Sequence, residues 1–235
     1  MKSSNKANAA TRVKLQFLQE KIRAVGGAPT TAWIAVMHSG DVQLQRECLA
    51  MLEFGGFRRR ELLPTLVAIF QDPTKDAGLR SELGSHIGAT RIVGAIYPLC
   101  QSLRFDPYPR IRASAVDGLS HFPERQCAVD ALIAALTNID EHDFVRASAA
   151  EYLGGAICGD PLPALVKVLT DDSPEQVRLS AVRAIGALKD ARALTTLNSI
   201  KQHGQTTVEV AQGTVSLESE AKRAIRRIRL SMPAA

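Results

Sequence analysis

The sequence predicts an all-α fold: a right-handed α-solenoid of about six stacked helix pairs, preceded by one further helix. The same phrase recurs along the chain as YPRIRASAVDGL, DFVRASAAEYL and SPEQVRLSAVRAI, at intervals of 34 and 32 residues. A sustained period of this length is the signature of a repeat architecture. The residues are 46% hydrophobic and only 5% aromatic, a composition that favours closely packed helices over a β-sandwich.

Each phrase predicts one helix, because apolar or small residues lie at an anchor position and four and eight residues after it. The anchors are Leu44, Leu79, Ile111, Val145, Val177 and Leu217. Positions 0, +4 and +8 share one face of a helix with 3.6 residues per turn. A second apolar-periodic segment precedes each phrase, and turn-forming stretches such as DPTKDAG and DPYPR separate the two. We call the first helix of each pair A and the second B.

A single helix pair cannot bury its apolar face, whereas stacked pairs bury a continuous core, so we expect one domain over 11–230. A flexible head at 1–10 precedes it and a tail at 231–235 follows. A helix over 11–26 opens the domain and ends at Gly26-Gly27. The six repeats are expected at about 30–56, 60–90, 91–122, 125–156, 160–189 and 190–230. The last repeat contains GQTTVEVAQGTVS, whose β-prone residues around a Gln-Gly turn are compatible with a small hairpin; a mobile loop is the alternative.

The phrase VRLSAVRAIGALKDARAL, preceded by PLPALVKVLTDDSP, resembles a HEAT repeat of the short kind found in phycobilin lyase subunits. The resemblance covers roughly residues 30–230. It implies that an Asp at the A–B turn and the Arg after the B-helix anchor form a structural ladder along the stack. The implied pairs are Asp72 with Arg80, Asp106 with Arg112, Asp172 with Arg178, and Asp140 or Asp143 with Arg146.

The resemblance also implies that the B helices line the concave surface, where positions +2, +6 and +9 point away from the buried stripe. The centre of this ridge has small side chains and two acids, and its ends are basic. We expect a protein partner there, bound through a helix or extended peptide with a central basic residue; a merely solvated ridge is the alternative. The expected contact residues are Arg46, Glu53, Ser81, Ser85, Asp117, Glu151, Arg183 and Arg223.

The sequence shows no constellation that indicates catalysis, a metal site or a cofactor. Deoxyhypusine hydroxylase, a HEAT-repeat metalloenzyme, is recognised by several His-Glu dipeptides, but none of the five histidines here precedes a Glu. The four cysteines form no C-x-x-C pair, and the chain has no GxGxxG, Walker or G-x-S-x-G motif. The sequence therefore predicts a protein that is not an enzyme: a protein–protein interaction module acting as adaptor, scaffold or specific inhibitor.

The net charge of +5 is unevenly distributed, with +6 in residues 1–60, −4 in 61–210 and +3 in 211–235. The acidic middle disfavours one continuous nucleic-acid surface, but the basic ends keep nucleic-acid binding as an alternative. That alternative would use Arg58, Arg59, Arg60, Lys222, Arg226 and Arg227. A second alternative, from the resemblance alone, is a phycobilin-lyase-like subunit that handles a chromophore.

No apolar run approaches the roughly 18–20 residues of a membrane span, and the start of the chain lacks the apolar core of a secretory signal. Cys48, Cys100, Cys127 and Cys158 are widely spaced, so we expect buried free thiols in a reducing compartment. The predicted location is the cytoplasm.

Overall fold

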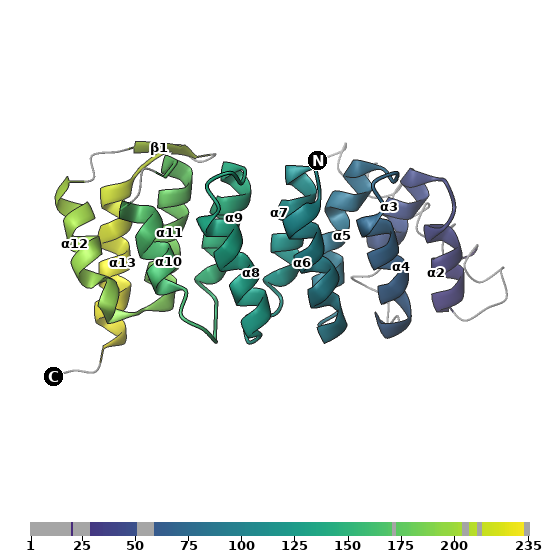
Figure 1. Ribbon diagram of the computed structural model, residues 1–235, viewed down its shortest axis with the longest axis horizontal. Coiled ribbons are helices and arrows are strands. Elements are labelled where there is room, and N and C mark those ends of the chain that lie inside the picture. Colours follow the sequence, from purple (N-terminus) through teal and green to yellow (C-terminus); the bar gives the residue numbers. More distant parts are fainter. Residues whose placement is uncertain are drawn as a thin grey trace, which may run out of the picture.

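The helices of this chain stack side by side in two layers, as the computed structural model shows (Figure 1). The structure describes Glu20 and residues 29–50, 59–170, 173–203, 207–210 and 213–232. Twelve α-helices lie within these ranges, and they confirm the predicted all-α solenoid of about six helix pairs. The expected N-terminal helix over 11–26 lies outside the described residues, except for Glu20, which is helical.

The described helices alternate between the two layers. The A helices are α2 (Pro29–Met37), α4 (Arg59–Gln71), α6 (Ile96–Phe105), α8 (Gln126–Thr137), α10 (Leu162–Thr170) and α12 (Leu194–His203). The B helices are α3 (Val42–Ala50), α5 (Ala77–Ala89), α7 (Pro109–Leu119), α9 (Asp143–Leu153), α11 (Glu175–Leu188) and α13 (Leu217–Ser231). The short 3-10 turns η2 (Val93–Ala95) and η3 (Ala191–Ala193) lead into α6 and α12.

The B helices begin where local chemistry favours a start. Asp76 caps α5 by accepting a hydrogen bond from the Leu79 main-chain N at 2.8 Å, and Ser216 caps α13 in the same way. Pro109 occupies the first turn of α7, where its missing N–H costs nothing. In α5, α7 and α13 the anchor residues Leu79, Ile111 and Leu217 thus lie in the first turn.

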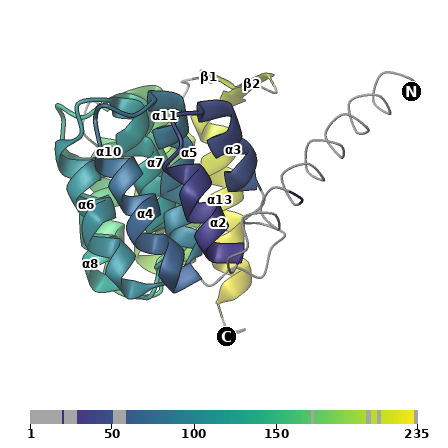
Figure 2. The same ribbon diagram turned by 90° about the vertical axis from the view of Figure 1, so that its right-hand side faces the viewer.

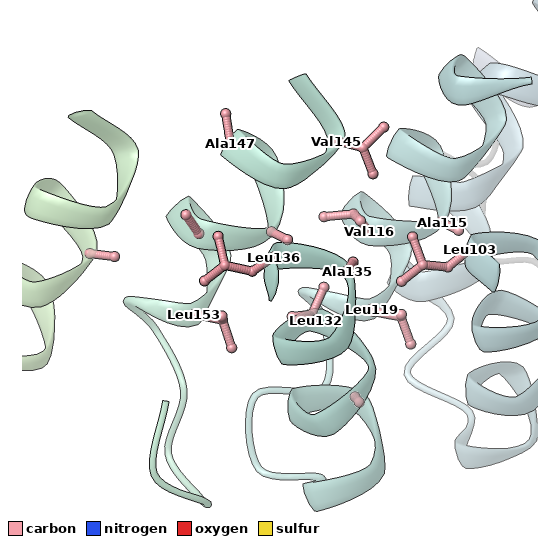
Figure 3. Close-up of a cluster of buried hydrophobic side chains, with 14 of the residues drawn as sticks. Leu103, Ala115, Val116, Leu119, Leu132, Ala135, Leu136, Val145, Ala147 and Leu153 are labelled. Atoms are coloured by element: carbon pink, nitrogen blue, oxygen red, sulfur yellow. The ribbon is translucent and has the colours of Figure 1, made fainter. Parts of the chain in front are cut away.

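The space between the layers is filled by the apolar stripes that the sequence predicts. Leu103 of α6, Leu119 of α7 and Leu132 of α8 are buried side by side, and the same packing continues through Leu136 and Leu153 (Figure 3). Each side chain of this size that leaves water stabilises the fold by about 1.5–3 kcal/mol. The core therefore runs along the stack as one continuous layer.

The two layers pack with different spacing. Gly88 of α5 lies so close to α7 that a Cβ on it would be 2.2 Å from the Gly118 carbonyl oxygen. Gly154 of α9 faces Ala184 of α11 in the same manner. Successive A helices pack more loosely against one another. The B helices therefore form the more closely packed of the two layers, and their place on the concave side stays a prediction.

The last repeat carries a hairpin, one of the two alternatives that its sequence left open. Strands β1 (Thr207–Val210) and β2 (Gly213–Ser216) pair antiparallel, with Val208 opposite Val215. The hairpin stands between α12 and α13 in the chain and lies at one edge of the stack, where it contacts α11 and α13 (Figures 1 and 2). The insertion thus lengthens the A–B turn without separating the two helices that it connects.

Candidate functional site

A groove of about 400 Å³ opens on the B-helix layer, across the middle of the stack. Its lining comes from α5, α7 and α9: Ser81, Glu82, Arg110, Ala113, Ser114, Asp117, Ser148 and Tyr152. Half of these side chains are Ser or Ala, which are too short to fill the space between neighbouring helices. The groove exists because the repeats place short residues at the same turn of three successive B helices.

Asp117 is held in a fixed orientation inside this groove. The Tyr152 hydroxyl of α9 donates a hydrogen bond to Oδ1 of Asp117 on α7, so the pair links two successive repeats. Burial raises the pKa of Tyr152, and the Asp117 carboxylate raises it further, so the phenol remains a protonated donor at neutral pH. A carboxylate offers about four acceptor sites, and this bond uses one of them.

The rim of the groove carries charges of both signs. Arg46 forms ion pairs with two carboxylates. Its Nε lies 3.2 Å from Oε1 of Glu82, and its Nη2 lies 3.5 Å from Oδ1 of Asp76. These contacts join α3 to α5 at the N-terminal side of the groove. Arg110, in the first turn of α7, is exposed at the rim.

We call the accessible residues along the B helices the open strip. This strip does not coincide with the ridge that the sequence predicts. Gly88, Gly154 and Gly186 at +9, and Ala147 and Leu179 at +2, are buried rather than exposed. The prediction failed there because a B helix packs against two neighbouring B helices as well as against its A helix. Position +6 is accessible in every B helix described, whereas positions +2 and +3 are each buried in two of them: Ala147 and Leu179 at +2, and Ser114 and Glu220 at +3.

The charges on this strip change sign along the stack. The +3 and +6 residues, in order, are Glu47 and Ala50, Glu82 and Ser85, Ser114 and Asp117, Ser148 and Glu151, Ser180 and Arg183, and Glu220 and Arg223. Each of the first four repeats thus contributes one carboxylate. In the last two repeats, Glu220 pairs with both Arg183 at 3.4 Å and Arg223 at 2.8 Å. The strip is acidic over α3 to α9 and basic toward α13.

The structure brings together part of the predicted contact set. Ser81 and Asp117 line the groove; Ser85 and Glu151 continue the strip beside it; Arg46 pairs with a carboxylate of the rim; Arg183 and Arg223 lie at the basic end; Glu53 lies outside the described residues. A third lining residue, Ala113, lies at position +2 of the predicted ridge. Sequence reasoning missed the other five: Glu82, Arg110, Ser114, Ser148 and Tyr152. The recurrence of polar residues at +3 was a usable signal for three of them. Tyr152, at +7, adjoins the apolar stripe and looks like a core residue.

The arginine ladder runs between successive repeats and not within each repeat. The fully buried Arg80 pairs through Nη2 with Asp106 of the next repeat, and its Nε donates to the Phe70 carbonyl at 2.8 Å. The predicted direct contact of Asp72 with Arg80 is therefore wrong; hydrogen bonds from Thr74 lower the pKa of Asp72 most, and the nearby charges of Lys75 and Arg80 lower it further. The Asp72 carboxylate instead accepts hydrogen bonds from the main chain and hydroxyl of Thr74, at 2.9 and 2.6 Å.

The next two arginines follow the same direction. Arg112 makes a bidentate contact with Glu141 of the next repeat at 2.8 and 2.7 Å, and it reaches Asp106 only through the main-chain carbonyl, at 2.8 Å. Arg146 donates to the Leu136 carbonyl at 3.1 Å and to Ser173 at 3.3 Å, in place of the predicted Asp140 or Asp143. Asp172, the predicted partner of Arg178, lies outside the described residues. The long arginine side chains leave the first turn of B and extend along the stack.

The basic residues proposed for nucleic acid are described in part. Arg58 lies outside the described residues, and for Arg59 only the helical main chain is described. Arg60, Arg226 and Arg227 are exposed, whereas Lys222 pairs with Glu218 at 2.5 Å. The basic surface that is described is therefore centred on the second half of α13.

The cysteines differ in exposure more than the sequence suggests. Cys48 is buried, and burial raises the pKa of its thiol to about 12. Burial also raises the pKa of Cys100 to about 11, although this side chain and Cys158 are only half-buried. Cys127 is exposed on α8, so the expectation of a buried thiol is wrong at this position.

Metal-ligating side chains do not gather in groups of three or more anywhere in the described part of the chain. Among the described helices, none combines the length and the apolar character that crossing a membrane requires.

The stacked A and B helices define a helical repeat scaffold, an α-solenoid. Residues 96–186 and 129–212 match the family model of HEAT repeats, and the chain belongs to the HEAT-repeat proteins. No curated protein sequence matches the chain. The narrower resemblance to the phycobilin-lyase type of repeat stays a prediction.

One of the similar solved structures is that of human deoxyhypusine hydroxylase in complex with glycerol. The identity is 14% and the TM-score 0.41, over 96% of this chain and 99% of that one. That protein is an enzyme. The prediction that this chain is not an enzyme was inferred only from the absence of familiar motifs. It is therefore wrong, and we withdraw it. A likeness at this level assigns no activity to this chain.

Proposed function

We propose that this HEAT-repeat scaffold is a protein–protein interaction module, an adaptor or a specific inhibitor, that holds a protein partner on its concave B-helix face. The observation that supports the proposal is the groove across α5, α7 and α9. Its floor of short side chains gives a partner close access to the helices, and its carboxylate at Asp117 is already oriented by Tyr152. A preoriented group loses less conformational entropy when a partner binds.

The test is a pull-down of the tagged full chain from nuclease-treated lysate of its native host, with mass spectrometry of the retained proteins. The variant Ala113→Arg places a long side chain in the groove, and Ala134→Arg places the same side chain at an exposed position of α8. We expect a protein that is retained by the wild type and Ala134→Arg but lost from Ala113→Arg. Retention of the same proteins by both variants would exclude the concave groove as the binding surface.

A second function, binding of a polyanion, is favoured by one observation at the end of the stack. Arg226, Arg227 and Arg229 are exposed on α13, while the carboxylates of Glu218 and Glu220 are paired with Lys222 and Arg223. Phosphate binding through such arginines would weaken steeply with salt. If labelled RNA bound the wild type with this salt dependence, and replacement of the three arginines by Gln removed it, the polyanion function would be supported.

A further inference from the structure

The acidic part of the open strip coincides with the groove. Glu82 and Asp117 line it, and Glu151 continues the strip on α9. The neighbouring cation Arg46 is already engaged by Glu82 and Asp76, and Tyr152 contributes a neutral hydroxyl. Because Glu82 is paired with Arg46 and Arg110 is exposed at the rim, Asp117 supplies the negative charge at the floor of the groove, and charge complementarity favours a cationic guest there.

The shape of the groove sets how much of a partner it accepts. Its volume of about 400 Å³ lies near the lower end of the roughly 300–1,000 Å³ typical of ligand pockets, enough for one long side chain. Ser81, Ala113 and Ser114 leave room for an aliphatic stem, and Asp117 lies where the stem's charged head would be stabilised. Exposed Arg110 at the rim repels a second cation, so a polybasic run is a poor fit.

Resting on the proposed function, we propose that the partner is a protein segment that inserts a single lysine or arginine side chain into this groove, where it pairs with Asp117 and Glu82. Tyr152 is a positioning residue in this arrangement, because it orients the Asp117 carboxylate from the neighbouring repeat. A partly desolvated ion pair of this kind is stronger than one on an open surface, because fewer water molecules compete with it.

The experiment selects random peptides by phage display on the purified full chain and measures the Kd of the enriched peptides by titration at neutral pH. The variants are Asp117→Asn, which keeps the acceptor oxygen for Tyr152, and the matched control Asp130→Asn on α8. Asp130 is exposed and accepts a hydrogen bond from Gln126 at 2.7 Å, so the control removes the same charge from the other layer. Thermal unfolding of each variant shows that it is folded.

We expect enriched peptides that share one basic residue, with Kd about 10- to 100-fold weaker for Asp117→Asn and unchanged for Asp130→Asn. Replacing the basic residue by Gln should weaken binding to the wild type equally and cause little further loss on Asp117→Asn. If Ala113→Arg weakens binding of the peptides but Asp117→Asn does not, the proposal of a cationic side chain is wrong, and the proposed binding site on the concave face is retained. If Ala113→Arg weakens binding of none of the enriched peptides, both the proposed binding surface and the proposed cationic side chain are wrong.

Discussion

Removing the carboxylate of Asp106 tests the coupling between repeats most directly. Arg80 is fully buried, and the Asp106 side chain is only 7% exposed. The variant Asp106→Ala leaves the guanidinium charge in the core without its carboxylate, which typically costs about 3–5 kcal/mol. It also removes the hydrogen bond from the Tyr108 main-chain N to Oδ1 of Asp106, at 3.0 Å, worth about 1 kcal/mol.

The assay is urea unfolding followed by circular dichroism. With a urea dependence near 3 kcal/mol per M, a loss of this size lowers the unfolding midpoint by about 1–2 M. The matched control is Asp72→Ala, at the equivalent turn one repeat earlier, where the carboxylate contacts only its own turn among its described hydrogen bonds. We expect no comparable shift of the midpoint for this control.

The double variant Arg80→Met with Asp106→Ala removes the buried charge together with its partner. An apolar side chain of similar volume often replaces a buried ion pair at little cost, although here the Phe70 carbonyl loses its donor. We therefore expect the double variant to be more stable than Asp106→Ala alone. The reasoning is refuted if the two losses add, or if Asp72→Ala destabilises the protein as much as Asp106→Ala does.

Three further predictions concern helix packing, the groove and the thiols. Gly88→Ala should lower the free energy of unfolding by about 1–3 kcal/mol, because the added Cβ meets main-chain atoms of α7, whereas Gly94→Ala meets nothing within 4 Å and should be tolerated; urea midpoints compare the two. Tyr152→Phe should cost about 1–2 kcal/mol through the lost bond to Asp117, and Tyr97→Phe, at a residue that is 72% exposed, should cost nothing in the same assay. Cys48 should resist alkylation until the chain unfolds, while Cys127 reacts in the native state, which mass spectrometry of labelled protein would show. Since burial raises the pKa of Cys48 from its ordinary 9.0 to about 12, its contribution to stability is complete below pH 9 and falls as pH rises toward 12; native-state labelling of Cys48 as fast as Cys127 would contradict both statements.

The helix pairs were predictable because their signal is local. The apolar spacing that begins at Ile111, Val145 and Val177 marks the buried face of each B helix without any knowledge of its neighbours, and these anchors are fully buried. The β-prone residues around a short turn near Thr207 made a hairpin one of two alternatives for the same reason. Both features depend on a few consecutive residues.

The features that the sequence did not reveal depend on how repeats sit beside one another. The acids at 72 and 106 precede Arg80 and Arg112 in equivalent turns, so only the stacking decides that Arg80 reaches forward to Asp106. Of the predicted ridge, position +6 stays accessible, whereas Gly88 is covered by the neighbouring helix α7 and Leu179 is buried. Lateral contacts between repeats leave no periodic mark within a single helix.

Because each of these arginines contacts the next repeat along the chain, removing repeats from one end of the stack should cost more than removing them from the other. A chain that ended after α5 would lack Asp106, so the normally buried guanidinium of Arg80 would lie at the new end without its carboxylate. A break before α6 that kept the later repeats would instead expose Asp106 as an ordinary carboxylate, which water solvates readily. Whole repeats should therefore be lost from the N-terminal end at lower cost than from the C-terminal end, so the two ends of this scaffold are not interchangeable in evolution or in engineering.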